Sequence, residues 1–351
     1  MRSRAPGWRG WVPWLGALLA VVALIWVLRG FDLERFRAVI TQADLRILLL
    51  VPLVVIVEQV IRAWKWRQLL WPLRPISTVY LFGAIMAGYL LAILIPFGFG
   101  TIARSWLVSR REDLKLTAVL ATVALDRMTD GVMFVCLVPV AVLATAFPDP
   151  TGGIRAGLAW GGGGSLVLFL ALFAGFELFR RQAVSPSPFV RRMGERLPAR
   201  LSGPTGRLTA SFAEGINWPQ DPRRIMGIVL ASVGIKLFAA MQLVPAGLAF
   251  GISLRPAEYL FVMVFLGFLV ILGHFLRLTG GFIIAGVFAL RLFGVPEEEA
   301  LAMTLVIQAA NILSVAGVGA VALWSQGVAL SEVRTASMTT EEHIATDRPA
   351  A

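Results

Sequence analysis

The chain has 351 residues, of which 58% are hydrophobic and 15% are charged, and its formal net charge is +11. A water-soluble domain of this length would carry far more charge, so the composition excludes that class and predicts a helical integral membrane protein. The aromatic residues lie in apolar stretches rather than beside an exposed basic stripe, which argues against nucleic-acid binding. One cysteine, Cys136, excludes an intrachain disulfide, and two histidines without a cysteine cluster give no metal-site spacing.

The first elements are two apolar spans separated by a short polar helix. The first span, residues 11–28, follows three arginines and is expected to be a retained signal anchor. Residues 31–43 carry both charge signs and read as an interfacial segment, and residues 45–70 form the second span. The end of that span is interpreted as an aromatic and cationic belt at the headgroup layer, made of Trp64, Lys65, Trp66, Arg67 and Trp71.

A break in the next apolar stretch predicts a re-entrant hairpin near 76–110. The stretch 76–95 ends at a tip that contains Pro96, Gly98 and Gly100. Backbone in lipid must satisfy its own hydrogen bonds, so such a break belongs inside protein or beside water. The arginine-rich segments on either side, 62–74 and 104–115, both belong on the cytoplasmic face by the positive-inside rule. The chain between them must therefore enter and leave the membrane on one face.

The rest of the chain repeats this order of elements. Spans are expected over 116–147, 156–179 and 225–250, and the basic segment 180–224 is expected in the cytoplasm. Apolar pieces 257–276 and 282–293 flank a second break at Gly280 and Gly281, which predicts a second hairpin near 257–293. Three glutamates, 297–299, open the last span, where the helix dipole favours anions. The span ends near Trp324, and 327–351 is expected to be a disordered tail.

These elements predict an all-α, polytopic helical bundle of two inverted repeats, each with a re-entrant helical hairpin. The N-terminal half is 1–153 and the C-terminal half is 154–326. Each half makes three full crossings, and an odd number gives the two halves opposite orientations, as in many transporters. Both termini are then expected in the cytoplasm, with the chain in a bacterial inner membrane.

Several residues in this order resemble the flippase-like family typified by the transmembrane region of lysylphosphatidylglycerol synthase. The first-half features are Gly88, then Pro96, Gly100 and Arg104 at intervals of four, then Asp126-Arg127-x-x-Asp130. The second half matches at Gly280-Gly281 and at Gly294-Val295-Pro296. The resemblance implies movement of a charged or glycosylated lipid between leaflets. The chain departs from the family pattern at Thr101 after the first tip, at Thr279 and Gly286 around the second tip, and at Gln308 in the last span. The second hairpin therefore lacks much of the charge that the family pattern has there.

Ionisable residues inside the spans are the candidate site, because such groups are costly in lipid and usually face the bundle interior. Arg104 lies one helical turn beyond the hairpin tip, where its guanidinium could grip a lipid phosphate or simply reach the interface. Asp126, Arg127 and Asp130 lie about 15 Å into their span by helical rise. They could bind a headgroup, relay protons or form a salt bridge with Arg104; we favour the structural role for Asp130 and leave the other two open.

Four further charged residues complete the predicted set. Glu58 and Arg62 are spaced for a helical ion pair, which could be self-contained or face a cavity. Lys236 lies mid-span without a carboxylate within four residues, so it should meet another helix, a lipid phosphate or water. Arg277 lies beside the second tip as Arg104 does beside the first.

The leading hypothesis is a lipid translocase, not an enzyme, that passes an anionic headgroup through a polar cavity while the lipid tail stays in the bilayer. No cofactor, metal or nucleic acid is expected, and the partner is a membrane lipid. A homo-oligomer and a complex with an enzyme of envelope-lipid synthesis both stay open. Two alternatives remain: an integral-membrane transferase acting on a lipid-linked substrate, with Asp126 or Glu58 as general base, and a non-catalytic partner of such a biosynthetic enzyme.

Overall fold

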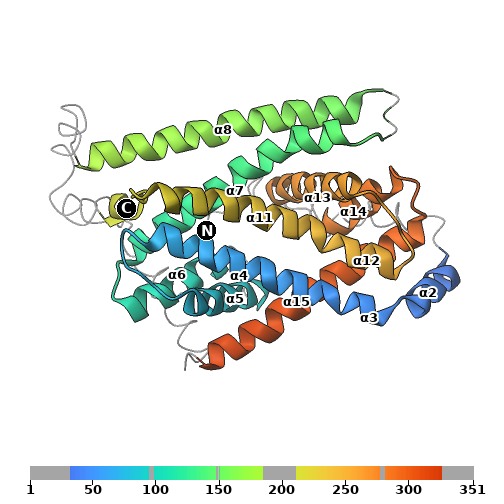
Figure 1. Ribbon diagram of the computed structural model, residues 1–351, viewed down its shortest axis with the longest axis horizontal. Coiled ribbons are helices and arrows are strands. Elements are labelled where there is room, and N and C mark those ends of the chain that lie inside the picture. The colour runs from blue at the N-terminus through green and yellow to red at the C-terminus, as the bar shows by residue number, and fades with distance from the viewer. Residues whose placement is uncertain are drawn as a thin grey trace, which may run out of the picture. The chain divides into compact units, whose positions relative to one another are not determined.

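The computed structural model describes residues 32–94, 99–147, 149, 151–184, 211–276 and 281–325 (Figure 1). All regular elements among these residues are helices, which confirms the predicted all-α class. Several predicted features lie outside the described residues: the span 11–28, the tail 327–351, most of the loop 180–224, and the site residues Pro96, Gly98, Arg277 and Gly280.

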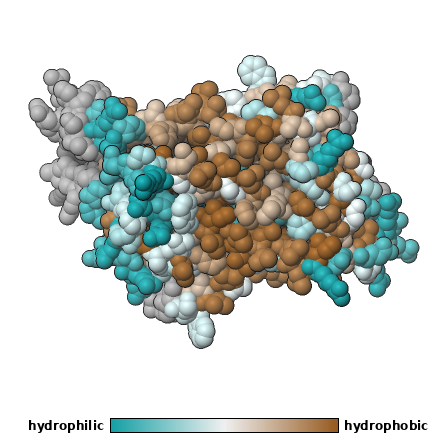
Figure 2. Space-filling model, in the orientation of Figure 1, coloured by the Kyte–Doolittle hydropathy of each residue, from teal (hydrophilic) through white to brown (hydrophobic). Residues whose placement is uncertain are grey.

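Five helical stretches in the described part of the chain are long and apolar enough to cross a membrane, and the chain is a multi-pass membrane protein. They are Leu45–Leu70, Leu116–Ala144, Gly153–Gln182, Pro222–Ala249 and Glu297–Ser325. These ranges agree with the spans expected from hydropathy. Figure 2 shows many hydrophobic side chains exposed on the surface, as helices in contact with lipid require.

The long stretches correspond to a few labelled helices in Figure 1. They are α3 (Leu45–Leu48) with α4 (Leu50–Leu70), α7 (Leu116–Ala144), α8 (Gly153–Val184), α11 (Pro222–Met241) with α12 (Leu243–Ala249), and α15 (Glu297–Ser325). Pro222 begins α11, where its missing N–H interrupts no helical hydrogen bond, whereas Pro139 lies inside α7. The first turn of α15 contains the three glutamates 297–299, as the sequence predicted.

Shorter helices fill the intervals between the long ones. They are α2 (Leu33–Gln42), α5 (Thr78–Leu94), α6 (Phe99–Glu112), α13 (Pro256–Leu276) and α14 (Gly281–Arg291). Asp32 caps α2 by accepting a hydrogen bond from the Arg35 backbone at 3.0 Å. The pairs α5–α6 and α13–α14 lie where the two hairpins were predicted. A helix of 14 residues, such as α6, rises only ~21 Å against ~30 Å of hydrocarbon. Re-entry from one face, and the inverted repeat, stay predictions.

The described residues form two compact units, each assembled from several parts of the chain. Among the described residues, the α5–α6 unit comprises 59–94, 99–130, 169–184, 211–233 and 312–325, and the α13–α14 unit comprises 32–58, 131–147, 149, 151–168, 234–276 and 281–311. Each unit holds one pair of short helices and a portion of each long helix. The division into halves 1–153 and 154–326 stays a prediction.

Glycines draw the helices of the α5–α6 unit together. A Cβ atom on Gly88 of α5 would lie 2.7 Å from the Gly100 carbonyl oxygen of α6, and one on Gly100 would meet the Gly88 carbonyl oxygen. Gly319 of α15 packs in the same way, since a Cβ atom on it would lie 2.6 Å from the Met86 carbonyl oxygen. Small residues of this kind let helix backbones approach closely in membranes. The interior of the unit is otherwise apolar, with Leu81, Leu91 and Val108 fully buried.

The α13–α14 unit is packed by aromatic rings as well as by glycines. The rings of Phe147 and Phe261 lie 4.5 Å apart, and the edge of Phe293 meets Phe261 at 5.6 Å. A Cβ atom on Gly267 of α13 would lie 2.6 Å from the Phe134 ring of α7. On α14, a Cβ on Gly286 would lie 2.6 Å from the Thr304 hydroxyl of α15, so these two helices are in close contact.

Candidate functional site

A buried cluster of charged side chains lies at the middle of the α5–α6 unit. Helix α4 supplies Arg62 and Lys65, α6 supplies Arg104, and α7 supplies Asp126 and Asp130. Asp126 is ten residues from the start of α7, about 15 Å along the helix axis. All five side chains are buried. The structure thus brings together most of the first-half residues that the sequence singled out.

Asp130 joins α7 to α4. Its carboxylate accepts a hydrogen bond from Arg62 Nη1 at 2.6 Å and from Lys65 Nζ at 2.5 Å, so each oxygen has a cationic donor. The structural role favoured for Asp130 is therefore directed at α4, whereas the sequence analysis considered a lock to Arg104. Buried charges of opposite sign need this kind of hydrogen-bonded pairing to offset the loss of hydration.

Lys65 is fully buried between the two aspartates of α7. Its ammonium group lies 3.1 Å from Asp126 Oδ1 and donates to the Asp126 backbone carbonyl at 3.1 Å, in addition to its bond with Asp130. The prediction of an interfacial belt is wrong for Lys65 and for Trp66, both of which are 0% exposed. Trp66 Nε1 donates a hydrogen bond to Thr122 of α7 at 3.0 Å. The carboxylates on α7 explain why this part of α4 is turned inward.

Arg104 is buried in this cluster at a distance from the nearest carboxylate. Its side chain is 2% exposed, and its three guanidinium nitrogens donate no hydrogen bond to any described residue. The nearest carboxylate oxygen, of Asp126, lies 3.9 Å from Nη2, and the guanidinium carbon lies 5.1 Å from the centre of the Trp66 ring. The Gly88–Gly100 contact fixes this position, because the Arg104 Cβ lies against Gly88.

Arg127 adds a second arginine beside Arg104. It is exposed, unlike its neighbours in α7, and it donates a side-chain hydrogen bond to the hydroxyl of Tyr89 on α5. Arg104, Arg127 and Arg62 are close enough to repel one another electrostatically. The exposed guanidinium of Arg127 and the buried guanidinium of Arg104 therefore both add positive charge to the cluster.

The cluster carries an excess of positive charge. Its cations are Arg62, Lys65, Arg104 and Arg127, and its anions are Asp126 and Asp130, so four positive groups face two negative ones. The buried Glu58, one turn before Arg62 on α4, still leaves one positive group in excess. An uncompensated cation at membrane depth is unfavourable, and an anionic ligand would neutralise it.

Two further predicted residues, Lys236 and Gly281, belong to the α13–α14 unit. Lys236 of α11 belongs to the α13–α14 unit, where its ammonium group lies 5.7 Å from the centre of the Phe134 ring on α7. This contact with another helix is the kind of partner that the sequence analysis required. Gly281, the described residue of the second tip, begins α14. Asn311 donates a hydrogen bond to Gln242 at 3.1 Å, so this polar pair joins α15 to the α11–α12 stretch.

The sequence patterns described above did not identify Lys65, Trp66 and Tyr89 as members of the cluster. The helical spacing of charged residues could have identified Lys65. Arg62 and Lys65 are three residues apart and share one face of α4, while Asp126 and Asp130 are four apart and share one face of α7. Two cations and two anions at matching helical intervals suit adjacent helices. Nothing comparable in the sequence indicates Tyr89.

No metal site emerges from the described residues, since no three His, Cys, Asp or Glu side chains are grouped to hold an ion. The chemistry available in the cluster is anion binding: arginine presents a planar fork of donors that suits phosphate and carboxylate.

The comparisons with known proteins give one match. The model of the lysylphosphatidylglycerol synthase transmembrane region matches residues 14–319. The chain belongs to this family. This confirms the resemblance found in the motifs, and it makes the chain a membrane protein related to lipid-modifying or lipid-handling functions. No curated protein and no solved structure matched the chain in these comparisons. The cluster around Arg104 lies within the matched range, as do the charged residues that were singled out from the sequence.

Proposed function

We propose that the protein translocates a lipid with an anionic phosphate headgroup between the leaflets of a bacterial inner membrane. The observation that carries this proposal is Arg104: a guanidinium 98% withdrawn from the surface whose nitrogens lack hydrogen bonds among the described residues. A buried arginine in that state is strongly disfavoured unless a ligand supplies acceptors. A phosphate offers them in the bidentate geometry that guanidinium prefers.

The neighbouring residues support a path for the headgroup. Arg127 is exposed and would meet the phosphate first, and Arg104 would bind it more deeply. Asp126 is the nearest anion to Arg104, but it lies closer to Lys65: the two distances are 3.9 Å and 3.1 Å. The longer contact can be given up to phosphate while Lys65 retains Asp126. The site therefore exchanges one anion for another without leaving a carboxylate unpaired.

Reconstitution in liposomes tests the proposal. The purified chain is placed in vesicles that contain a fluorescent phosphatidylglycerol, and transfer to the outer leaflet is followed by chemical quenching. We expect the wild-type protein to accelerate transfer and Arg104→Gln to slow it by about tenfold or more, because a charge-assisted contact of ~1.5–3 kcal/mol is lost. Arg104→Lys should be intermediate, since lysine keeps the charge without the fork.

Arg110→Gln is the matched control. Arg110 lies on the same helix as Arg104 but is exposed at its end, over the ring of Trp106. The Arg110→Gln variant should transport lipid at the wild-type rate. Equal rates in Arg104→Gln and Arg110→Gln would contradict the proposal. Covalent turnover of the lipid, seen by mass spectrometry, would instead favour the transferase, and absence of both activities would favour the non-catalytic partner.

Cysteine labelling tests the topology that the proposal assumes. In a Cys136→Ser background, cysteine is introduced by Gly98→Cys just before helix α6 or by Ser109→Cys near the end of that helix. Impermeant reagents are then applied from each side of the membrane. A re-entrant α5–α6 pair predicts that Ser109→Cys reacts from the cytoplasmic side and that Gly98→Cys does not react from the outside alone. Exclusive reaction of Gly98→Cys from the outside would make α6 a crossing and would reverse the assigned orientation.

A further inference from the structure

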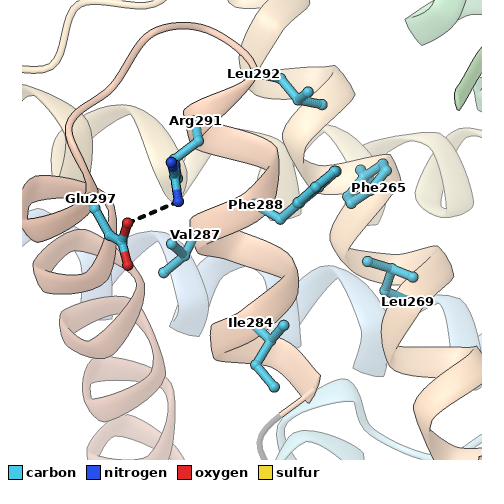
Figure 3. A pocket seen from close by; sticks show the side chains of 8 residues that line it. All are labelled: Phe265, Leu269, Ile284, Val287, Phe288, Arg291, Leu292 and Glu297. Atoms are coloured by element: carbon cyan, nitrogen blue, oxygen red, sulfur yellow. Dashed lines mark hydrogen bonds and ion pairs between the residues drawn. The ribbon is translucent and has the colours of Figure 1, made fainter. Parts of the chain in front are cut away.

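The α13–α14 unit contains a pocket that the charged cluster does not use. Its volume is about 570 Å³, within the range of small-molecule sites. It is lined by residues of α13, α14 and the start of α15: Phe265, Leu269, Ile284, Val287, Phe288, Arg291, Leu292 and Glu297 (Figure 3). Six of these eight side chains are aliphatic or aromatic. The lining is therefore suited to hydrocarbon along most of its length.

The apolar wall is formed where α14 faces α13. Figure 3 shows Phe288 of α14 pointing towards Phe265 of α13, and their rings are nearly parallel with centres 5.6 Å apart. Val287 is buried, whereas Phe288 is 42% exposed. Both helices are among the apolar helices of the chain. A wall of this composition, open to the surroundings, admits an acyl chain from the bilayer more readily than a polar solute.

The polar end of the pocket is an ion pair. Arg291 is in the last turn of α14, and its Nη1 donates to Glu297 Oε2 of α15 at 2.8 Å (Figure 3). The close Gly286–Thr304 contact brings these helices near enough for that bond. Arg291 keeps half of its side chain exposed, and the bond uses one of the five N–H donors of a guanidinium. The end of an apolar helix is also the depth at which headgroups lie.

Charges around the ion pair select the kind of headgroup. The first turn of α15 contains Glu297, Glu298 and Glu299, and Arg35 of α2 lies 3.8 Å from Glu298. The pairs Arg291–Glu297 and Arg35–Glu298 therefore place positive and negative groups side by side at the start of α15. A headgroup that carries only negative charge would meet Arg291 but be repelled by the glutamates. A headgroup with both a phosphate and an ammonium satisfies each side.

We propose that this pocket binds a zwitterionic glycerophospholipid with a primary ammonium. One acyl chain occupies the wall between α13 and α14, the phosphate contacts Arg291, and the ammonium lies toward the glutamates at the start of α15. The site is separate from the Arg104 cluster and does not depend on the proposed transport activity. It is a lipid-binding site of the α13–α14 unit in its own right.

Photocrosslinking tests the acyl-chain part. The full chain is reconstituted in phosphatidylglycerol vesicles that contain phosphatidylethanolamine with a diazirine in one acyl chain, and crosslinked peptides are identified by mass spectrometry. Crosslinks should concentrate on residues 265–269 and 284–292, which line the pocket. Ile284→Trp, which fills the pocket, should reduce them about tenfold. Leu143→Trp adds the same bulk at a position of α7 that is 85% exposed in the same unit, and it should leave them unchanged. Equal crosslinking in both variants would show ordinary contact with bulk lipid and would overturn the proposal.

A second arm tests the headgroup with surface substitutions that the fold should tolerate. The same diazirine chain is attached to phosphatidylglycerol, and the ratio of crosslinks from the two probes is measured. Wild-type protein should favour phosphatidylethanolamine, and Glu297→Gln should reduce that preference about tenfold by removal of a charge-assisted contact. Arg291→Gln should weaken crosslinking of both probes, because both carry a phosphate. Equal crosslinking of the two probes to the wild-type protein would overturn the assigned headgroup.

Discussion

The helix pairs α5–α6 and α13–α14 are arranged alike, but one unit has a charged interior and the other has an apolar pocket. Each pair is closely packed, and each is followed by a long helix, α7 after α5–α6 and α15 after α13–α14. In the α5–α6 unit, the interior holds ion pairs between side chains that are at most 8% exposed. In the α13–α14 unit, the ion pairs of Arg35 and Arg291 leave those arginines about half exposed, and the internal space is an apolar pocket.

This difference indicates in which unit stability depends most on interactions between buried charges. Attraction between charges increases steeply as water is removed, and so does the penalty for a charge that loses its partner. The α5–α6 unit should therefore be sensitive to the loss of one charged group. The α13–α14 unit, whose described polar contacts are mainly neutral or exposed, should tolerate comparable changes. Paired substitutions in the two units test this contrast.

The largest effect is expected from Asp130→Ala. The substitution removes the carboxylate that accepts from both Arg62 and Lys65, and leaves those cations buried. Breaking a buried pair in this way costs about 3–5 kcal/mol. We expect a large fall in the free energy of unfolding, measured by detergent titration with circular dichroism, and a low yield of monodisperse protein.

The control for Asp130→Ala is a change that removes the cations as well. Arg62→Leu, Lys65→Met and Asp130→Leu together replace the ion pairs with apolar groups, which often preserves stability. Asp126 would then lose Lys65 but keep Arg104, 3.9 Å away. The triple variant should be more stable than Asp130→Ala. If the single variant were the more stable one, the ion pairs would not be holding α4 to α7.

The next effect concerns the glycines that bring α5 and α6 together. In Gly88→Ala, the new methyl group would lie 2.7 Å from a backbone oxygen and 2.9 Å from the Arg104 Cβ. Overpacking of this kind costs about 1–3 kcal/mol. The matched control is Gly163→Ala in α8 of the other unit, where nothing lies within 4 Å of the added methyl group. That variant should be neutral or more stable by ~0.5–1 kcal/mol, because alanine is the better helix former.

Thermal unfolding in detergent compares these two glycine variants directly. We expect the midpoint temperature of unfolding to be lower than wild type for Gly88→Ala, and unchanged or higher for Gly163→Ala. A lower midpoint in both would mean that glycine is required in these helices for a reason other than close packing.

The sequence was sufficient to predict most of the fold. Membrane thickness imposes a minimum length on each span, so hydropathy alone located α4, α7, α8, α11 and α15. Pro and Gly breaks located the two short pairs, since lipid does not tolerate unpaired backbone. The grouping of helix portions into two units was not predictable in this way, because it depends on contacts between residues far apart in the chain.

The candidate site was only partly predictable, for a related reason. Asp126, Arg127 and Asp130 were recognisable because a charge within an apolar span is unusual. Lys65 was not, because it lies among tryptophans and arginines near a helix end, a composition typical of the membrane interface. Its burial depends on the two aspartates of α7, 61 and 65 positions further along the chain. A prediction made from one helix at a time does not include partners on another helix.

A smaller effect is expected where a neutral hydrogen bond joins two helices. Thr122→Val removes the hydroxyl that accepts from Trp66 Nε1 and leaves that buried N–H unpaired, at a cost of about 1 kcal/mol or slightly more. Thr304→Val is the matched control in the α13–α14 unit, because the Thr304 hydroxyl donates to the Ala300 carbonyl within its own helix. We expect a lower unfolding midpoint for Thr122→Val and little change for Thr304→Val. Equal losses would show that the Trp66 bond does not stabilise the α4–α7 contact.

The smallest effect is expected from the Asn311–Gln242 pair of the α13–α14 unit. Asn311→Leu removes a donor 3.1 Å from the Gln242 side-chain oxygen, and hydrogen bonds between membrane helices contribute on average only ~0.6 kcal/mol. Because Gln242 also donates to the Ala239 carbonyl, its amide keeps one partner. A double-mutant cycle with Gln242→Leu, read out by detergent titration, should give a coupling energy of that size. A coupling as large as the loss in Asp130→Ala would mean that neutral pairs hold the α13–α14 unit as strongly as ion pairs hold the other, and the contrast between the two units would then lie in their binding sites alone.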